Sequence, residues 1–197
     1  MNTLRVYRIL KKTAMSGPGA RYSIWVQGCD QRCKGCAAPE TWPHDGGSLC
    51  AITELARDIL SVEDIEGVTF LGGEPFLQAS ALAQLAKTMQ ENGLSVVTFT
   101  GFLLQDLLLS EEDGVKELLE ATDLLIDGPF RQEEFDLSRP WVGSANQKYH
   151  FLTPRYAWRD IEDIPNQVEV RISPNGKVLV NGMGDFGEIK HILEEHT

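Results

Sequence analysis

The chain has 197 residues, of which 42% are hydrophobic and 24% are charged, and its formal net charge is −11. This composition is typical of a folded domain, and no apolar run approaches the roughly 20 residues that a membrane span requires. The acidic balance argues against a nucleic-acid partner, because neutralising phosphates takes a concentrated basic face. The first twelve residues lack the apolar region of a secretory signal. We therefore expect a cytoplasmic protein with one domain over residues 1–197 and no membrane partner.

Short strand-like apolar runs alternate with helix-like runs, which predicts an α/β fold with a mainly parallel sheet. The helix around residues 80–92 has an apolar stripe, with Ser80 as its expected cap and Gly93 as its stop. In such folds ligands bind outside the carboxyl ends of the strands, so these ends should line one site. The expected strands are Tyr22–Gln27, Val68–Leu71, Leu94–Thr100 and Leu124–Ile126, and the expected helices are Thr53–Leu60, Ser80–Asn92 and Gly114–Ala121.

The pattern changes beyond about residue 150. Val168–Ile172 and Lys177–Asn181 alternate apolar and polar residues on either side of the turn Ser173–Gly176, which predicts a hairpin. Phe186–Glu195 is typical of a closing helix. No linker separates this tail, at about residues 165–197, from the core at about residues 20–150, so we expect both to belong to one domain.

Three cysteines, Cys29, Cys33 and Cys36, lie close together with three and two intervening positions. A structural zinc site normally has four ligands, whereas a four-iron cluster held by three thiolates keeps one iron open for a non-protein ligand. The triplet therefore favours a [4Fe-4S] cluster. The alternatives are a zinc-binding module completed by Cys50 or His44, and an iron–sulfur protein that only transfers electrons.

A second motif, Gly72-Gly73-Glu74-Pro75, comes directly after the apolar run at Val68–Leu71. By itself it is typical of a tight strand-to-helix turn. Beside a cluster, its backbone and its carboxylate could bind the ammonium group of a small ligand.

Together these motifs resemble the radical S-adenosylmethionine enzymes. Within that superfamily, the short chain and the later motifs are most similar to the small glycyl radical activating enzymes, such as the activating proteins of anaerobic ribonucleotide reductase. The resemblance covers most of the chain and depends on Gly28–Trp42, Phe70–Pro75, Thr100–Phe102, Leu125–Phe130 and Trp141–Gln147.

The resemblance implies a partial (β/α)6 TIM-like barrel, open along one side, with S-adenosylmethionine as the second cofactor. It implies that S-adenosylmethionine is cleaved reductively and that the resulting 5′-deoxyadenosyl radical activates a glycyl radical enzyme, most directly anaerobic ribonucleotide reductase. A flavodoxin- or ferredoxin-like protein would donate the electron. Modification of a peptide substrate is the second interpretation within the same chemistry. The implied metal ligands are Cys29, Cys33 and Cys36, and the implied cofactor-binding residues are Gly72, Gly73, Glu74, Pro75, Thr100, Asp127, Ser144 and Asn146.

Overall fold

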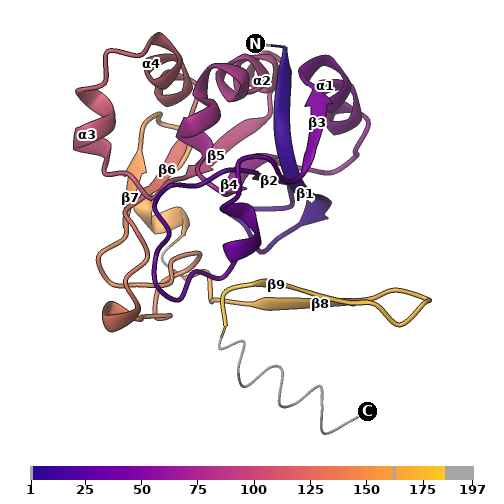
Figure 1. The fold of residues 1–197 in the computed structure, drawn as a ribbon, viewed down its shortest axis with the longest axis vertical. Helices are drawn as coiled ribbons and strands as arrows, with labels where there is room; N and C mark the ends of the chain where they lie inside the picture. The colour runs from indigo at the N-terminus through magenta and orange to yellow at the C-terminus, as the bar shows by residue number, and fades with distance from the viewer. Residues whose placement is uncertain (1, 162, 185–197) are drawn as a thin grey trace, which may run out of the picture.

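The computed structural model describes residues 2–161 and 163–184 of the chain. A mixed sheet of seven strands, in the order β3-β1-β2-β4-β5-β6-β7, forms its centre (Figure 1). The neighbouring strands β2, β4, β5 and β6 are parallel, whereas β1, β3 and β7 run antiparallel to the strands beside them. The strands are β1 Thr3–Thr13, β2 Arg21–Val26, β3 Ser48–Ala51, β4 Gly67–Gly72, β5 Ser95–Phe99, β6 Leu124–Asp127 and β7 Lys148–Phe151.

Four α-helices occur in the described residues: α1 Ile52–Leu60, α2 Ala79–Glu91, α3 Leu104–Leu108 and α4 Asp113–Glu120. Short 3-10 helices lie at η1 Pro39–Thr41, η2 Pro75–Gln78, η3 Gln132–Glu134 and η4 Trp158–Asp160. None of the described helices is both long and apolar enough to span a bilayer.

The four parallel strands and three of the helices confirm the sequence prediction, with small shifts at their ends. The expected cap was wrong, because α2 starts at Ala79 and Ser80 already lies inside it. The strands β1, β3 and β7 and the short helix α3 were not predicted. In β1, the charged residues obscure an alternation that buries Leu4, Val6 and Leu10.

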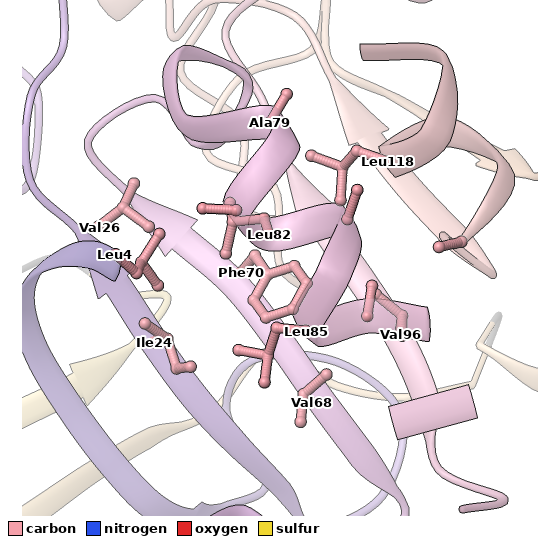
Figure 2. Packing of buried hydrophobic residues seen from close by; sticks show 14 of the residues in the cluster. Leu4, Ile24, Val26, Val68, Phe70, Ala79, Leu82, Leu85, Val96 and Leu118 are labelled. Atoms are coloured by element: carbon pink, nitrogen blue, oxygen red, sulfur yellow. The ribbon is translucent and has the colours of Figure 1, made fainter. Parts of the chain in front are cut away.

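The main hydrophobic core lies between one face of the sheet and the helices. Phe70 and Val68 of β4 and Ile24 of β2 project toward Leu82 and Leu85 of α2, and all five side chains are fully buried (Figure 2). The apolar residues of α2 recur at helical spacing, so one side of this helix is buried along its length.

The opposite face of the sheet is covered at one end only. Val97, Leu124 and Ile126 contact a second cluster that includes Trp141 and Tyr156. Near the amino ends of the strands, Arg21 fills this face: it is fully buried and donates hydrogen bonds to the Thr69 Oγ1 (2.7 Å) and the carbonyl oxygen of Val68 (2.6 Å), among others. The carboxyl ends of the strands are left to border a cavity.

The predicted hairpin is confirmed as β8 Val168–Ile172 and β9 Val178–Gly182, which form a sheet of their own. It extends away from the body of the molecule (Figure 1). The helix expected at Phe186–Glu195 lies outside the described residues. The single-domain organisation stays a prediction.

Candidate functional site

A cavity of about 740 Å³ lies at the carboxyl ends of the parallel strands, on the face that the helices do not cover. Trp25, Leu71 and Phe99 form its wall, because they alternate with the strand residues that enter the helix-side core. Its floor and rim come from the loops that follow the strands. Among the predicted site residues, those that line it are Cys29, Cys33, Cys36, Gly72, Gly73, Glu74 and Thr100.

The cysteine loop starts directly beyond β2 and is fixed by backbone hydrogen bonds. The Gly28 N–H donates to the Thr41 carbonyl oxygen (2.7 Å) and the Cys29 N–H donates to that of Trp42 (3.2 Å). Gly28 has a positive φ of 99°, in the region that favours glycine. These contacts bend the loop back on itself, so that all three thiols reach the same cavity.

The environment of the thiols fits a metal cluster. Burial raises the pKa of Cys29 and of Cys33, nearby backbone N–H groups partly oppose this shift, and the negative charge of Glu74 adds to it. Buried thiols of this kind are protonated until a metal cation displaces the proton. Residues 2–161 and 163–184 contain no group of three or more His, Cys, Asp or Glu side chains that could close around one metal ion. The three cysteines nevertheless border one cavity, and their thiolates are the ligands that iron–sulfur clusters take.

The residues considered for a fourth zinc ligand are placed elsewhere. His44 Nε2 lies 2.8 Å from Asp30 Oδ1, on the exposed side of the loop. Cys50 belongs to β3, pairs with Leu4 of β1 and contacts the helix-side core. Neither is among the described residues that line the cavity.

Glu74 is the most enclosed charged group of the site, with 1% of its surface exposed. Its Oε1 accepts hydrogen bonds from the Thr100 hydroxyl (2.8 Å) and the Phe76 N–H (3.0 Å), and its Oε2 accepts from the Gly101 N–H (2.8 Å). Burial raises the pKa of Glu74 to about 7, and these three hydrogen bonds oppose the shift. Since each carboxylate oxygen has two lone pairs, Oε2 retains one acceptor position.

The glycine pair before Glu74 joins two loops at close range. The Gly73 N–H donates to the Val26 carbonyl oxygen and the Glu74 N–H to that of Gly28, both at 2.8 Å. A Cβ atom on Gly73 would lie 2.4 Å from the Gly28 oxygen, and one on Gly72 would lie 2.6 Å from the Cα of Trp25. We expected the backbone of this turn to be free to bind a ligand. The N–H groups of Gly73 and Glu74 are instead hydrogen-bonded within the protein. Only oxygen atoms of this turn could therefore accept a hydrogen bond from an ammonium group.

Asp127, Ser144 and Asn146 are outside the set of described residues that line the cavity. Asp127 Oδ2 accepts from the Leu104 N–H (2.6 Å), and its Oδ1 lies 3.0 Å from His150 Nε2 at angles that do not form a hydrogen bond. The buried hydroxyl of Ser144 accepts from the backbone of the loop before it, and Asn146 donates to a nearby carbonyl oxygen, both within the same loop region. Pro75 begins η2 and is also outside the lining.

Several lining residues were not anticipated from the sequence. Gln147 orders the later loop, because its Oε1 accepts from the Gly143 N–H (2.9 Å) while its Nε2 donates to the Gly128 carbonyl oxygen (3.2 Å). The Arg8 guanidinium lies 4.1 Å from the ring centroid of Trp25, and burial lowers the pKa of Arg8. The alternation along β2 could have identified Trp25, since its neighbours on both sides face the helices.

Comparisons with known proteins show to which family the chain belongs. Residues 15–150 match the family model described as a 4Fe-4S single cluster domain. The chain is 33% identical over 147 residues to the anaerobic ribonucleoside-triphosphate reductase-activating protein of Vibrio cholerae, an alignment that covers 71% of this chain and 92% of that protein. Its identity to the protein of the same name from Haemophilus influenzae is 30% over 158 residues, covering 76% and 97%. It is also 30% identical over 132 residues to the pyruvate formate-lyase-activating enzyme of Clostridium pasteurianum, covering 57% and 56%.

Proposed function

The chain belongs to the 4Fe-4S single-cluster family of the anaerobic ribonucleoside-triphosphate reductase-activating proteins, and on this premise we propose that it generates the glycyl radical of an anaerobic ribonucleotide reductase. One observation carries the proposal: the three clustered thiols and the Gly73-Glu74 turn line the same cavity at the carboxyl ends of the strands. A cluster held by these thiols and a small charged ligand at this turn would thus be adjacent.

Cys29, Cys33 and Cys36 would hold the [4Fe-4S] cluster, and S-adenosylmethionine would occupy the cavity beside Glu74. When bound, the cluster would supply the electron for reductive cleavage of S-adenosylmethionine, and the target glycine would supply the hydrogen atom that converts the 5′-deoxyadenosyl product to 5′-deoxyadenosine. The electron would come from a flavodoxin- or ferredoxin-like protein.

Glu74 supplies the charge that the amino group of S-adenosylmethionine requires. Its carboxylate is held by three hydrogen bonds, so it is already oriented when the ligand arrives. Thr100 serves this orientation through its hydroxyl group. An ammonium ion at the open position of Oε2 would favour the ionised carboxylate and lower its pKa from about 7.

The aromatic wall of the cavity restricts water. Trp25, Phe99 and Phe130 line it, and their rings replace solvent around any bound ligand. Exclusion of water matters here because a carbon radical reacts with whatever it meets. Asp127, Ser144 and Asn146 were expected to contact the ribose and carboxylate of the ligand. Because they lie outside the cavity lining, we propose instead that they order the loops around the ligand.

We propose that the seven-stranded sheet corresponds to the partial (β/α)6 barrel with an open side that the resemblance implies. Support comes from the one-sided helix cover, from the four adjacent parallel strands and from the cavity on the uncovered face. Such an open side would admit a segment of a protein, which is the substrate that the proposed function needs.

The test combines the reduced protein, S-adenosylmethionine and the anaerobic ribonucleotide reductase encoded in the same genome, without oxygen. We expect electron paramagnetic resonance to show a glycyl doublet that is lost when the target glycine is replaced by alanine. Formation of 5′-deoxyadenosine with no protein radical, together with a mass change in a peptide encoded nearby, would replace this function by peptide modification. Iron and sulfide without any 5′-deoxyadenosine would indicate an electron carrier instead.

A further inference from the structure

One face of the hairpin β8–β9 is apolar and exposed. Directly paired residues of two strands project to the same side, so the pairs Val170–Val180 and Ile172–Val178 share one face. Ile172 is 68% exposed, Val178 43% and Val170 42%. We call these four residues the hairpin face. An isolated two-stranded hairpin is marginally stable in water, and exposed apolar strands readily associate with another chain.

The other face of the hairpin carries Leu179 and three polar residues, Glu169, Arg171 and Asn181, and these polar residues attach it to the body. The Thr13 hydroxyl donates to Glu169 Oε2 (2.8 Å) and accepts from Asn181 Nδ2 (3.1 Å), and Arg171 donates to the carbonyl oxygen of Lys12. Arg171 and Glu169 also form an ion pair at 2.7 Å. These contacts direct the charged groups of the strands toward β1, and they leave the hairpin face turned away from it.

The hairpin face continues into the cavity. Val180, a member of the hairpin face, lines the cavity, as do Asn181 and Gly182 of β9 and Met183 just beyond it. Phe135, which is also exposed, lines the cavity from a different segment. Within the hairpin face no charged side chain lies between Ile172 and Val180, and Val180 borders the cavity that the three thiols also line.

We propose that the hairpin face binds the glycine-bearing segment of the partner protein in an extended conformation and leads the glycine into the cavity. The proposal rests on the function proposed above. Glycine has no side chain to be recognised, so the binding energy must come from the residues beside it. Because the hairpin face is uncharged in a protein of net charge −11, it would select apolar flanking residues over charged ones.

The first test is the double substitution Ile172→Thr with Val178→Thr. Threonine is also β-branched, so the hairpin should still form while the apolar surface is lost. The matched control is Leu109→Thr, which removes an exposed apolar side chain at the end of α3, outside the cavity lining. We measure affinity for the anaerobic ribonucleotide reductase and, without partner, the iron content and the yield of 5′-deoxyadenosine.

We expect the double variant to bind the reductase about ten-fold more weakly or worse, with unchanged iron content and 5′-deoxyadenosine yield, while the control binds normally. Equal affinity of the double variant and the control would overturn the proposal. If the unsubstituted protein makes 5′-deoxyadenosine but never a glycyl radical, the proposed function itself fails, whichever way the hairpin variants bind.

A second test identifies what contacts the hairpin face. Ile172 is replaced by the photoreactive residue p-benzoylphenylalanine, the complex is irradiated without oxygen, and the crosslinked peptides are sequenced by mass spectrometry. We expect the reductase peptide that contains the radical glycine. Crosslinks only to residues 185–197 of this chain, or only to a second copy of it, would overturn the proposal.

Discussion

Glu74 should make the stability of the cluster-free protein depend on pH in a way that glutamine at the same position does not. The carboxyl group is buried and its pKa is raised from 4.5 to about 7 in the folded chain. Glu74→Gln keeps the size of the side chain and the acceptor for Thr100 and Phe76, but it removes the ionisable group.

The magnitude follows from linkage between protonation and folding. When folding raises the pKa of a carboxyl group, the protein has its full stability below the pKa that the group has in the unfolded chain. Stability is lost as the pH rises from that value through the pKa that the group has in the folded chain. The shift from 4.5 to about 7 is about 2.5 units, which corresponds to roughly 3 kcal/mol. The unsubstituted protein should therefore lose this much of its free energy of unfolding between about pH 4 and pH 8 because of Glu74 alone.

Other groups titrate over the same range, so the informative quantity is the difference between the two proteins. Glu74→Gln also places an amide NH2 near the Gly101 N–H, which costs about 1 to 3 kcal/mol at every pH. Because this cost is the same at every pH, it does not change how the difference in free energy of unfolding between the two proteins varies with pH. Urea unfolding of both cluster-free proteins, with thiols kept reduced, gives the free energy of unfolding at each pH.

We expect the advantage of the unsubstituted protein over Glu74→Gln to shrink by roughly 3 kcal/mol from pH 4 to pH 8. A difference that stays constant over this range would refute the reasoning, because Glu74 would then titrate alike in the folded and unfolded chains. A difference that grows with pH would mean that the hydrogen bonds from Thr100, Phe76 and Gly101 outweigh burial.

Three further outcomes are expected. Cys33→Ala should lose the iron bound after anaerobic reconstitution, whereas Cys50→Ala should retain it, and iron retained in the first variant would remove Cys33 from the ligands. Gly73→Ala should destabilise the protein by at least about 1 kcal/mol in urea unfolding, because the new Cβ atom would lie 2.4 Å from a carbonyl oxygen. The control is Gly93→Ala, whose Cβ atom would have no other atom within 4 Å, so this variant should cost only the strain of its positive φ. Leu82→Ala should cost about 2 to 5 kcal/mol, since Leu82 is fully buried between α2 and the sheet, and a cost under about 1 kcal/mol would contradict this packing.

Local sequence patterns were enough to predict the centre of the fold. The apolar runs at β4 and β5 and the helical spacing along α2 report burial directly, and each depends on residues close together in the chain. The strands β1 and β3 could not be found in this way. Their pairing joins residues about 45 positions apart, as between Leu4 and Cys50. In addition, β1 contains four lysines and arginines among its eleven residues, and β3 is only four residues long.

The parts of the site that depend on the spacing of residues along the chain were predictable. The parts that depend on contacts between distant segments were less so. The cysteine triplet and the turn at Glu74 follow strand ends, and they line the cavity as the parallel arrangement implies. The orientation of Asp127 could not be read from its position at the end of β6, because it depends on the amide of Leu104, the first residue of α3. Arg8 was missed because a cationic side chain in a basic N-terminal strand looks solvated until Trp25 is placed beneath it.

Two hydrogen bonds connect Gly73 to Val26 and Glu74 to Gly28, and they make the cysteine loop and the turn at Gly72-Gly73-Glu74-Pro75 a single mechanical unit. Neither loop can be lengthened, shortened or replaced without changing the backbone to which the other is attached. A graft of this site onto another parallel sheet would therefore have to carry both loops and the two neighbouring strands β2 and β4 together. A graft of the cysteine loop alone would transfer the thiols but not the geometry that aims them.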